Sequence, residues 1–351
     1  MSEHWTVEKM AAERLVRYRD LKPCRNAFVD TYTPGSDQKE NFTIIGPGVA
    51  EHPDQHVHIA EPHGFNIGGA RQPAGCLNSQ HSHETEEVFI VHSGRWAFRW
   101  GVEAEDGEAI LGPGDCISIP PRVFRGFENV GDGVGYLFAV LGRDDPGRVT
   151  WAPDVFEKAR DYGLVLLENG QLVDTTKGET VPAGVAPMHP TDQPMVDAHR
   201  RMTDVEMASC VVLENEQIRF AGSDLQDASN GVSESPIIGM SNPEEGIAAG
   251  KLVWRHGFGV RRLDFATDGS TPMHAREEEE VVYLFSGKLL FSWEGGELAM
   301  ESGDVLTVPK GLARKFSAQG AEAVAYVVRG GDYPEAAALV EEKAAAAAVV
   351  A

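Results

Sequence analysis

The chain has 351 residues, of which 42% are hydrophobic and 24% charged, with 38 glycines and 20 prolines. This length and composition exclude a single small core, a disordered chain and a coiled coil, and they leave room for two globular domains. The formal net charge of −23 repels phosphate backbones and anionic lipids, so we expect neither nucleic acid nor a membrane as a partner.

The N-terminal segment indicates a helical arm and no export signal. Apolar and charged residues alternate at helical spacing from Val7 to Leu21. Residues 1–10 lack the apolar core of a secretion signal, and no apolar run approaches the ~18 residues that a membrane span needs. The four cysteines are too scattered for a disulfide framework or a zinc site. These features predict a cytoplasmic protein with buried thiols.

Strand signals follow in the first half of the chain. Short segments rich in β-branched or aromatic residues are bounded by Gly, Pro, Asn or Asp: Val88–Val91, Trp96–Trp100, Cys116–Ile119 and Gly135–Leu141. Regular short strands with few helical patterns favour an antiparallel sandwich or barrel.

Helical patterns are few and lie outside these strands. Asp154–Tyr162 and Gln193–Ser209 each predict a short helix, with a proline-rich linker between them. The segment from Pro334 to Val350 begins with proline and continues with alanine and glutamate, which predicts a C-terminal helix.

An internal repeat organises the chain. Pairs of identical residues 193 positions apart include Ile44 and Ile237, His63 and His256, His81 and His274, and Glu87 and Glu280. After a deletion of four residues the offset becomes 189, as in Arg125 and Arg314. Each copy has the size of one compact domain, so the chain is a tandem duplication.

The repeat sets the expected domain boundaries. We expect the arm and the first barrel in residues 1–165 (core 41–146), a linker in 166–234, and the second barrel with the C-terminal helix in 235–351 (core 235–334). The expected fold class is all-β, with two tandem barrels and a few peripheral helices.

A histidine motif in the first copy is the strongest candidate for a functional site. His81 and His83 are two residues apart, so on a strand they would lie on the same face, and Glu87 follows four residues later. If all three face a barrel interior, two imidazoles and a carboxylate can converge on one divalent ion, such as Fe²⁺, Mn²⁺, Ni²⁺ or Zn²⁺. Three protein ligands leave open coordination positions, which is typical of a catalytic metal.

The segment from Gly75 to Gly94 resembles the first conserved motif of the cupin family, G-x5-H-x-H-x3-E-x6-G, at every fixed position. The second cupin motif is matched in part, and Arg125 stands where the family has a fourth ligand histidine. The chain therefore resembles a bicupin, whose fold is two double-stranded β-helix, or jelly-roll, barrels. This resemblance implies a metal site inside a barrel and chemistry on small acids, aromatic diols, sugars or diketones, as in oxalate decarboxylases, quercetin dioxygenases and gentisate-type dioxygenases.

The second copy has lost part of the ligand motif. Arg276 replaces His83, so His274 and Glu280 are the family ligands that are left. Two ligands seldom hold a metal against water, and we expect the second barrel to be free of metal. Its Arg276 and Arg314 outnumber Glu280, which suits an anion or a backbone carbonyl.

Arg125 has two interpretations. As a catalytic residue it would clamp an anionic substrate, because guanidinium pairs bidentately with carboxylates. A divalent ion with Arg125 and Glu87 would give the pocket a charge of about +2, which favours a carboxylate, an enolate or a catecholate. Alternatively, Glu87 and Arg125 form a buried ion pair and the histidines are core residues. The recurrence of this pair as Glu280 and Arg314 supports a structural ion pair, whereas the exact spacing of His81, His83 and Glu87 favours a metal site, so both interpretations of Arg125 stay open.

Three functions are compatible with these observations. The leading hypothesis is a metal-dependent dioxygenase in which His81, His83 and Glu87 hold Fe²⁺ and Arg125 faces a small aromatic or dicarbonyl acid. The second is an isomerase or lyase in which the ion acts as a Lewis acid without O₂. The third is a ligand-binding bicupin without catalysis. The N-terminal arm and the alanine-rich tail are candidate contacts between copies in a homo-oligomer.

Overall fold

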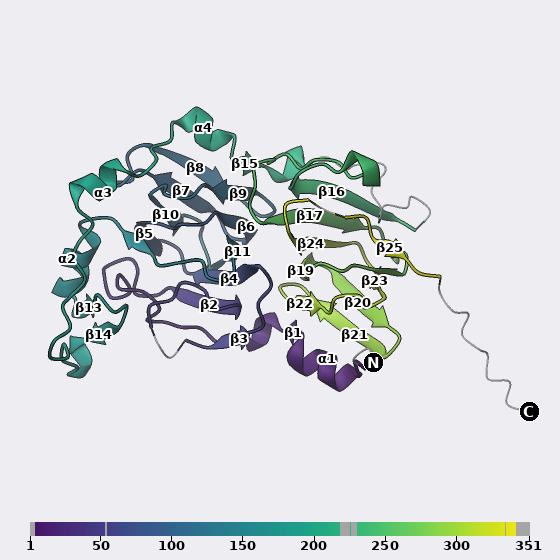
Figure 1. Ribbon diagram of the computed structural model, residues 1–351, viewed down its shortest axis with the longest axis horizontal. Coiled ribbons are helices and arrows are strands. Elements are labelled where there is room, and N and C mark those ends of the chain that lie inside the picture. Colours follow the sequence, from purple (N-terminus) through teal and green to yellow (C-terminus); the bar gives the residue numbers. More distant parts are fainter. Residues whose placement is uncertain (1–3, 53–54, 218–224, 226–229, 334, 342–351) are drawn as a thin grey trace, which may run out of the picture. The chain divides into compact units, whose positions relative to one another are not determined.

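The chain folds into two compact units (Figure 1). The computed structural model describes residues 4–52, 55–217, 225, 230–333 and 335–341. The first-copy unit contains the described residues within 19–217 and 256–258, and the second-copy unit those within 1–18, 218–255 and 259–351. In these ranges no helix is both long and apolar enough to cross a membrane.

The first-copy unit is built from two main sheets. The larger has the strand order β15-β9-β6-β11-β4-β2-β3, with β2 (Glu40–Ile45), β3 (Val57–Ile59), β4 (Phe65–Gln72), β6 (Glu87–Ser93), β9 (Cys116–Ile119), β11 (Gly135–Gly142) and β15 (Val211–Val212). The smaller has the order β12-β5-β10-β7-β8, with β5 (Leu77–Ser82), β7 (Trp96–Trp100), β8 (Gly107–Leu111), β10 (Arg125–Asn129) and β12 (Thr150–Trp151). A separate hairpin joins β13 (Leu164–Leu166) and β14 (Leu172–Asp174).

The core of this unit lies between its two sheets. Phe89 on β6 packs against Phe98 on β7 and Phe127 on β10, with ring centroids 5.3 and 5.1 Å apart. All three side chains are buried. Because β6 belongs to the larger sheet and β7 and β10 to the smaller one, these aromatic contacts hold the two sheets face to face.

The second-copy unit repeats this strand order. Its larger sheet is β1-β22-β19-β24-β17-β16, with β1 (Leu15–Val16), β16 (Val232–Ile238), β17 (Phe258–Phe265), β19 (Glu280–Ser286), β22 (Val305–Val308) and β24 (Ala323–Gly330). Its smaller sheet is β21-β20-β23-β18-β25, with β18 (His274–Ala275), β20 (Lys288–Trp293), β21 (Gly296–Glu301), β23 (Arg314–Ala318) and β25 (Ala338–Leu339). The predicted all-β fold with a tandem duplication is confirmed.

The helices lie outside the sheets and are short. In the described residues they are α1 (Val7–Glu13), α2 (Val155–Asp161), α3 (Gln193–Asp197) and α4 (Asp204–Ala208), with 3₁₀ turns η1 (Tyr18–Asp20), η2 (Thr175–Lys177), η3 (Glu214–Glu216) and η4 (Pro243–Glu245). The helix expected at 154–162 is present as α2. The single helix expected at 193–209 is instead two, because Asp192 caps α3 and Thr203 caps α4.

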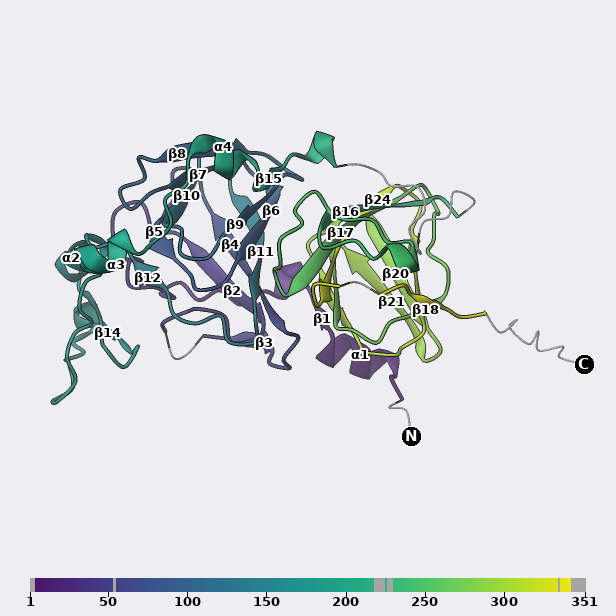
Figure 2. The same ribbon diagram turned by 45° about the horizontal axis from the view of Figure 1, so that its top comes forward.

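The N-terminal arm folds with the second copy, which corrects the expected first boundary. Leu15 on β1 pairs with Leu306 on β22, and Arg17 Nη1 lies 2.7 Å from Asp304 Oδ2. Both views show α1 beside β21 (Figure 2). The arm folds with the second copy because β22 would otherwise be an edge strand with unpaired main-chain groups, and β1 pairs with them.

The expected linker also needs a correction. Its described part up to residue 217 folds with the first-copy unit, where Val211 on β15 pairs with Ile117 on β9. Strand β15 therefore covers the edge of β9 as β1 covers the edge of β22. Each edge is closed by a segment remote in sequence, which local patterns do not reveal.

The C-terminal helix expected at 334–350 lies mostly outside the described residues. Its described part, residues 335–341, is extended instead of helical, because β25 pairs with β18. Leu339 is paired with His274, and the main-chain N–H of Val340 donates to the carbonyl of Met273 at 2.9 Å. Pairing with an open strand has overridden the helix propensity of alanine.

We expect Met10→Ala to destabilise the second-copy unit. Met10 on α1 is fully buried in the core of that unit, so its truncation should lower the free energy of unfolding by about 2–5 kcal/mol. Urea unfolding followed by circular dichroism would measure this loss. Glu13→Ala, at an exposed position on the same helix, is the control and should change stability little. Equal stability of wild type and Met10→Ala would contradict the docking of the arm.

Candidate metal centre

The structure brings His81, His83 and Glu87 together. His81 lies near the end of β5, His83 follows that strand, and Glu87 is the first residue of β6. Their candidate ligand atoms all lie within 4.8 Å of one another, and all three residues are buried. Because β5 and β6 belong to different sheets, the group lies inside the sandwich.

The hydrogen bonds of the two histidines leave nitrogen atoms for a ligand. His81 Nδ1 lies 2.7 Å from the carbonyl oxygen of Ser79, so Nδ1 carries the proton and the lone pair is on Nε2. His83 Nδ1 is buried and has no hydrogen-bond partner among the described residues. His83 Nε2 lies 3.7 Å from Glu87 Oε2. A buried nitrogen without a partner is costly, and a metal ion would satisfy it, so this donor set fits a divalent ion.

Burial sets the protonation of the site. It lowers the pKa of His81 and of His83 well below the usual value, and the positive charge of Arg125 lowers both further. Both imidazoles are therefore neutral at neutral pH, which is the form that binds metal. Burial raises the pKa of Glu87, and the adjacent Arg125 guanidinium offsets part of that rise.

Arg125 forms an ion pair with Glu87. Its Nη2 pairs with Glu87 Oε2, and its Nη1 donates to the carbonyl oxygen of His81 at 3.0 Å. Its side chain is 2% exposed, and Arg125 is not among the residues that line the cavity beside the site. The sequence left two arrangements of Arg125 open, and the structure shows the ion pair with Glu87. Arg125 contacts Glu87 and does not line this cavity.

A cavity of about 70 Å³ adjoins the three candidate ligands. Its lining is mainly apolar, with three amides, and includes Phe28, Asn41, Phe42, Val49, Asn66, Ile67, Gly68, Asn78, Phe89, Phe127 and Leu141. The Nδ2 of Asn41 is buried and has no hydrogen-bond partner among the described residues. The cavity therefore offers an apolar space with a hydrogen-bond donor at its wall.

Sequence reasoning missed Trp151 and Glu51. Trp151 on β12 pairs with His81 and packs on its ring, with centroids 5.3 Å apart. Trp151 Nε1 donates to Glu51 Oε1 and the main-chain N–H of Val29 donates to Glu51 Oε2, both at 2.7 Å. Burial raises the pKa of Glu51 to about 7. No motif marks these residues, because their contact with the site depends on the pairing of β12 with β5.

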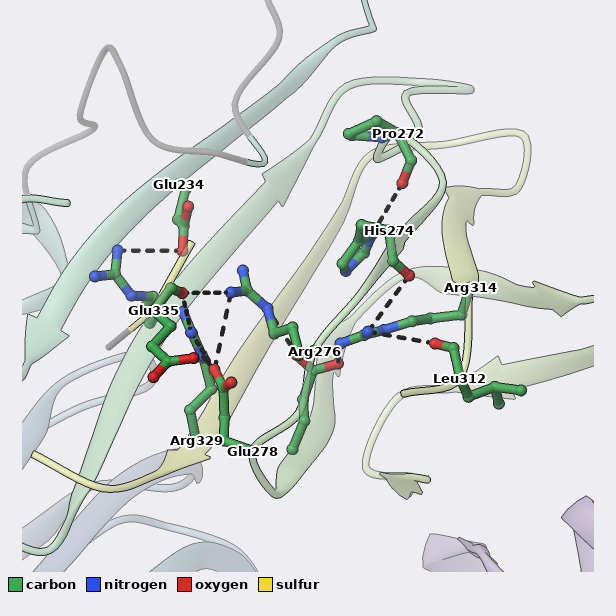
Figure 3. Close-up of polar contacts among 11 residues, drawn as sticks. Glu234, Pro272, His274, Arg276, Glu278, Leu312, Arg314, Arg329 and Glu335 are labelled. Carbon is green, nitrogen blue, oxygen red and sulfur yellow. Dashed lines mark hydrogen bonds and ion pairs between the residues drawn. The ribbon is translucent and has the colours of Figure 1, made fainter. Parts of the chain in front are cut away.

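The equivalent place in the second copy is crowded with charged side chains (Figure 3). His274 Nδ1 lies 2.9 Å from the carbonyl oxygen of Pro272, as His81 does from that of Ser79. Arg276 stands at the position of His83, with its Nε 3.3 Å from Glu280 Oε2. The guanidinium repels a metal cation and has no lone pair to donate, so a second copy without metal stays a prediction.

The ion pair of the first copy recurs in the second. Arg314 Nη2 lies 2.6 Å from Glu280 Oε1, and both side chains are almost fully buried. Burial alone would raise the pKa of Glu280, but the charges of Arg314 and Arg276 lower it to about 2. Glu280 is therefore an ionised carboxylate shared by two guanidinium groups.

Comparison with known proteins gives a family match and a fold match. The family model of the cupin domain matches residues 70–141 and 261–329. No curated protein matches the chain significantly. The oxalate decarboxylase of Bacillus subtilis at pH 4.6 aligns with a TM-score of 0.55 and 12% identity over 96% of this chain and 80% of that one. The 7S globulin of Momordica charantia aligns with a TM-score of 0.53 and 11% identity over 90% and 83%. These likenesses concern the fold alone.

We expect the stability of the protein to fall as the pH rises through the pKa of Glu51. The Glu51 carboxyl binds its proton more tightly in the folded state than in the unfolded chain. The stability that this gives is therefore lost as the pH rises from the usual pKa of 4.5 to the raised pKa of about 7. The full loss is on the order of 3 kcal/mol. Urea unfolding of wild type and Glu51→Gln across this range would measure it, with Glu105→Gln as an exposed control. An identical pH dependence in wild type and Glu51→Gln would contradict the assignment.

Proposed function

The chain belongs to the cupin superfamily and carries two cupin domains, and from this premise we propose that its first-copy unit is a metal-dependent enzyme for a small anionic substrate. The observation that carries the proposal is the grouping of His81, His83 and Glu87 at the wall of a cavity. The second copy has an arginine in place of one of these ligands, so the proposal assigns the chemistry to the first copy.

His81 and His83 would bind the ion through neutral imidazole nitrogens, and Glu87 through a carboxylate oxygen. Two histidines and one carboxylate suit Fe²⁺, and Mn²⁺, Ni²⁺ or Zn²⁺ are alternatives. When bound, the ion would act as a Lewis acid toward an oxygen of the substrate. Arg125 keeps Glu87 ionised and in place, so we infer that it is a positioning residue and that the substrate does not touch it.

The charge of the site favours an anion. The two histidines are neutral, and the charges of Glu87 and Arg125 cancel, so the charge of a divalent ion is left uncompensated. The apolar lining would surround the body of the substrate and exclude water from it. The buried Nδ2 of Asn41 would donate a hydrogen bond to a second oxygen of the substrate. A small aromatic or dicarbonyl acid would match the charge of the site, its apolar lining and the Asn41 donor.

Two reactions are compatible with this site. Oxygenation of the substrate is the first, because three protein ligands leave room for a chelating substrate and O₂. Carbon–carbon bond cleavage without O₂ is the second, and the fold likeness to oxalate decarboxylase favours it at a TM-score of 0.55. Both reactions need the same ligand set, and they differ in their requirement for O₂.

Metal analysis tests the ligand set. We expect about one divalent ion per chain in wild type purified without chelator, and none in His83→Ala, because two ligands hold an ion poorly. His274→Ala removes the repeated histidine of the second copy and is the matched control, with metal content equal to wild type. Wild type that stays free of metal after reconstitution with Fe²⁺ under reducing conditions would contradict an enzyme and favour the ligand-binding hypothesis.

Turnover with and without O₂ tests the reaction. We expect the Fe²⁺-loaded protein to consume O₂ with one or more of a panel of catechols, gentisates and β-diketones, and to be inactive without O₂. Release of CO₂ from oxalate, or any product formed under strictly anaerobic conditions, would instead support the lyase. Glu87→Gln should abolish either activity and Glu280→Gln should not. No turnover in any arm by metal-loaded protein would refute the enzyme proposal.

A further inference from the structure

A second pocket adjoins the cavity of the first-copy unit. We call it the outer pocket, and it is lined by residues 48–51, 147–149, 166, 169–170 and 188. These residues come from the segment after β2, the segment before β12, and the β13–β14 hairpin with the chain that follows it. The volume of the outer pocket is about 260 Å³, which exceeds that of the cavity.

One short segment separates the outer pocket from the cavity. Gly48, Val49 and Ala50 line both spaces. The main-chain N–H of Gly48 donates to Asn66 Oδ1 at 2.9 Å, and Asn66 also lines the cavity. The φ of Gly48 is +63°, in the left-handed region that glycine adopts without strain. A ligand in the outer pocket is therefore one segment of main chain away from the cavity.

The cavity by itself is too small for an aromatic ring. An apolar cavity of about 150 Å³ is known to hold benzene. The cavity beside His81, His83 and Glu87 has about 70 Å³. An aromatic acid therefore needs space beyond the cavity, and the outer pocket is large enough to hold its ring.

Arg148 is the group through which the outer pocket can hold an anion. Its side chain is exposed, and its Nη1 donates to the carbonyl oxygen of Glu168 at 3.1 Å. That carbonyl is neutral, and within the described ranges Arg148 has no carboxylate partner. Because the formal net charge of the chain is −23, most of its surface repels an anion. An uncompensated guanidinium is a local exception to this repulsion.

Glu51 is the other ionisable residue in the lining of the outer pocket. Both of its carboxyl oxygens already accept hydrogen bonds, from Trp151 and from the main-chain N–H of Val29. Burial raises the pKa of Glu51 to about 7, so this carboxyl is mostly protonated at about pH 6. At that pH Glu51 does not cancel the charge of Arg148.

Apolar side chains form the wall of the outer pocket. Val149 and Leu166 are 7% and 3% exposed and belong to a buried cluster. Val49 and Met188 pack against the same cluster. The outer pocket thus combines an apolar wall with one guanidinium, which suits a carboxylate that carries an apolar ring.

We propose that the outer pocket binds a small aromatic carboxylate through Arg148, and that an acid substrate passes from there into the cavity. The planar guanidinium pairs with the carboxylate, and the apolar wall covers the ring. Binding in the outer pocket needs no metal ion. The passage into the cavity rests on the proposed function, so the two parts are tested separately.

Isothermal titration calorimetry with sodium benzoate tests the binding. The full-length protein is stripped of metal with a chelator and titrated at about pH 6 and constant ionic strength. We expect saturable binding of benzoate, and about tenfold weaker binding of benzamide, which has the same ring without the charge. No binding of benzoate would overturn the proposal. Equal affinities for benzoate and benzamide would overturn the carboxylate assignment.

Variants of Arg148 locate the bound benzoate. Arg148→Gln should weaken its binding about tenfold, and Arg148→Lys, which keeps the charge, should weaken it less. Arg160→Gln is the matched control, because Arg160 is also exposed in the same unit and does not line the outer pocket. If Arg148→Gln binds benzoate as tightly as wild type, the ligand lies elsewhere and the proposal is wrong.

Steady-state kinetics of the metal-loaded protein tests the passage into the cavity. With an acid substrate that wild type turns over, Arg148→Gln should lower kcat/KM about tenfold, through KM, with metal content equal to wild type. Arg160→Gln should match wild type. An unchanged KM in Arg148→Gln, or a loss confined to kcat, would overturn the passage. Binding of benzoate without turnover of any substrate would refute the enzyme proposal and the passage, and would support the outer pocket as a ligand site.

Discussion

A buried glutamate–arginine pair connects the two sheets in each copy. Glu87 begins β6 of the larger sheet and Arg125 begins β10 of the smaller one, and Glu280 and Arg314 occupy the same places on β19 and β23. Loss of one partner would leave a buried charge, which costs about 3–5 kcal/mol. The position of each carboxylate is therefore fixed by the fold. A site beside this pair therefore contains a carboxylate whose orientation is fixed and whose charge is already balanced by an arginine.

The neighbours of this pair decide what each copy can do. Beside Glu87 the neighbours are small or neutral, namely His83 and the glycine at position 68, and an open cavity results. Beside Glu280 the same positions are Arg276 and Arg261, which are buried and pair with Glu280 and Glu234. The duplication thus kept the element that joins the sheets and changed the residues around it.

The sequence predicted the parts of this arrangement that are local. The repeat and its short strands indicated the duplicated all-β fold, and the spacing of His81, His83 and Glu87 indicated their convergence, because a strand places alternate residues on one face. The edge strands were missed, since β1 and β15 pair with segments far away in the chain. Glu51 and Trp151 were missed for the same reason. The orientation of Arg125 was left open because an ion pair and a substrate clamp need the same residue type.

The charge around the shared glutamate differs between the two copies. In the first copy the charges of Glu87 and Arg125 cancel and the histidines are neutral, so under the proposed function an anion would be attracted to these residues only after a metal ion has been bound. In the second copy Arg276 and Arg314 both pair with Glu280, and their charges lower its pKa to about 2. The same buried carboxylate has a second guanidinium beside it in one copy and a neutral imidazole in the other. A cation is therefore repelled from the second-copy carboxylate, whereas the first-copy carboxylate lies beside groups that can share it with a metal ion.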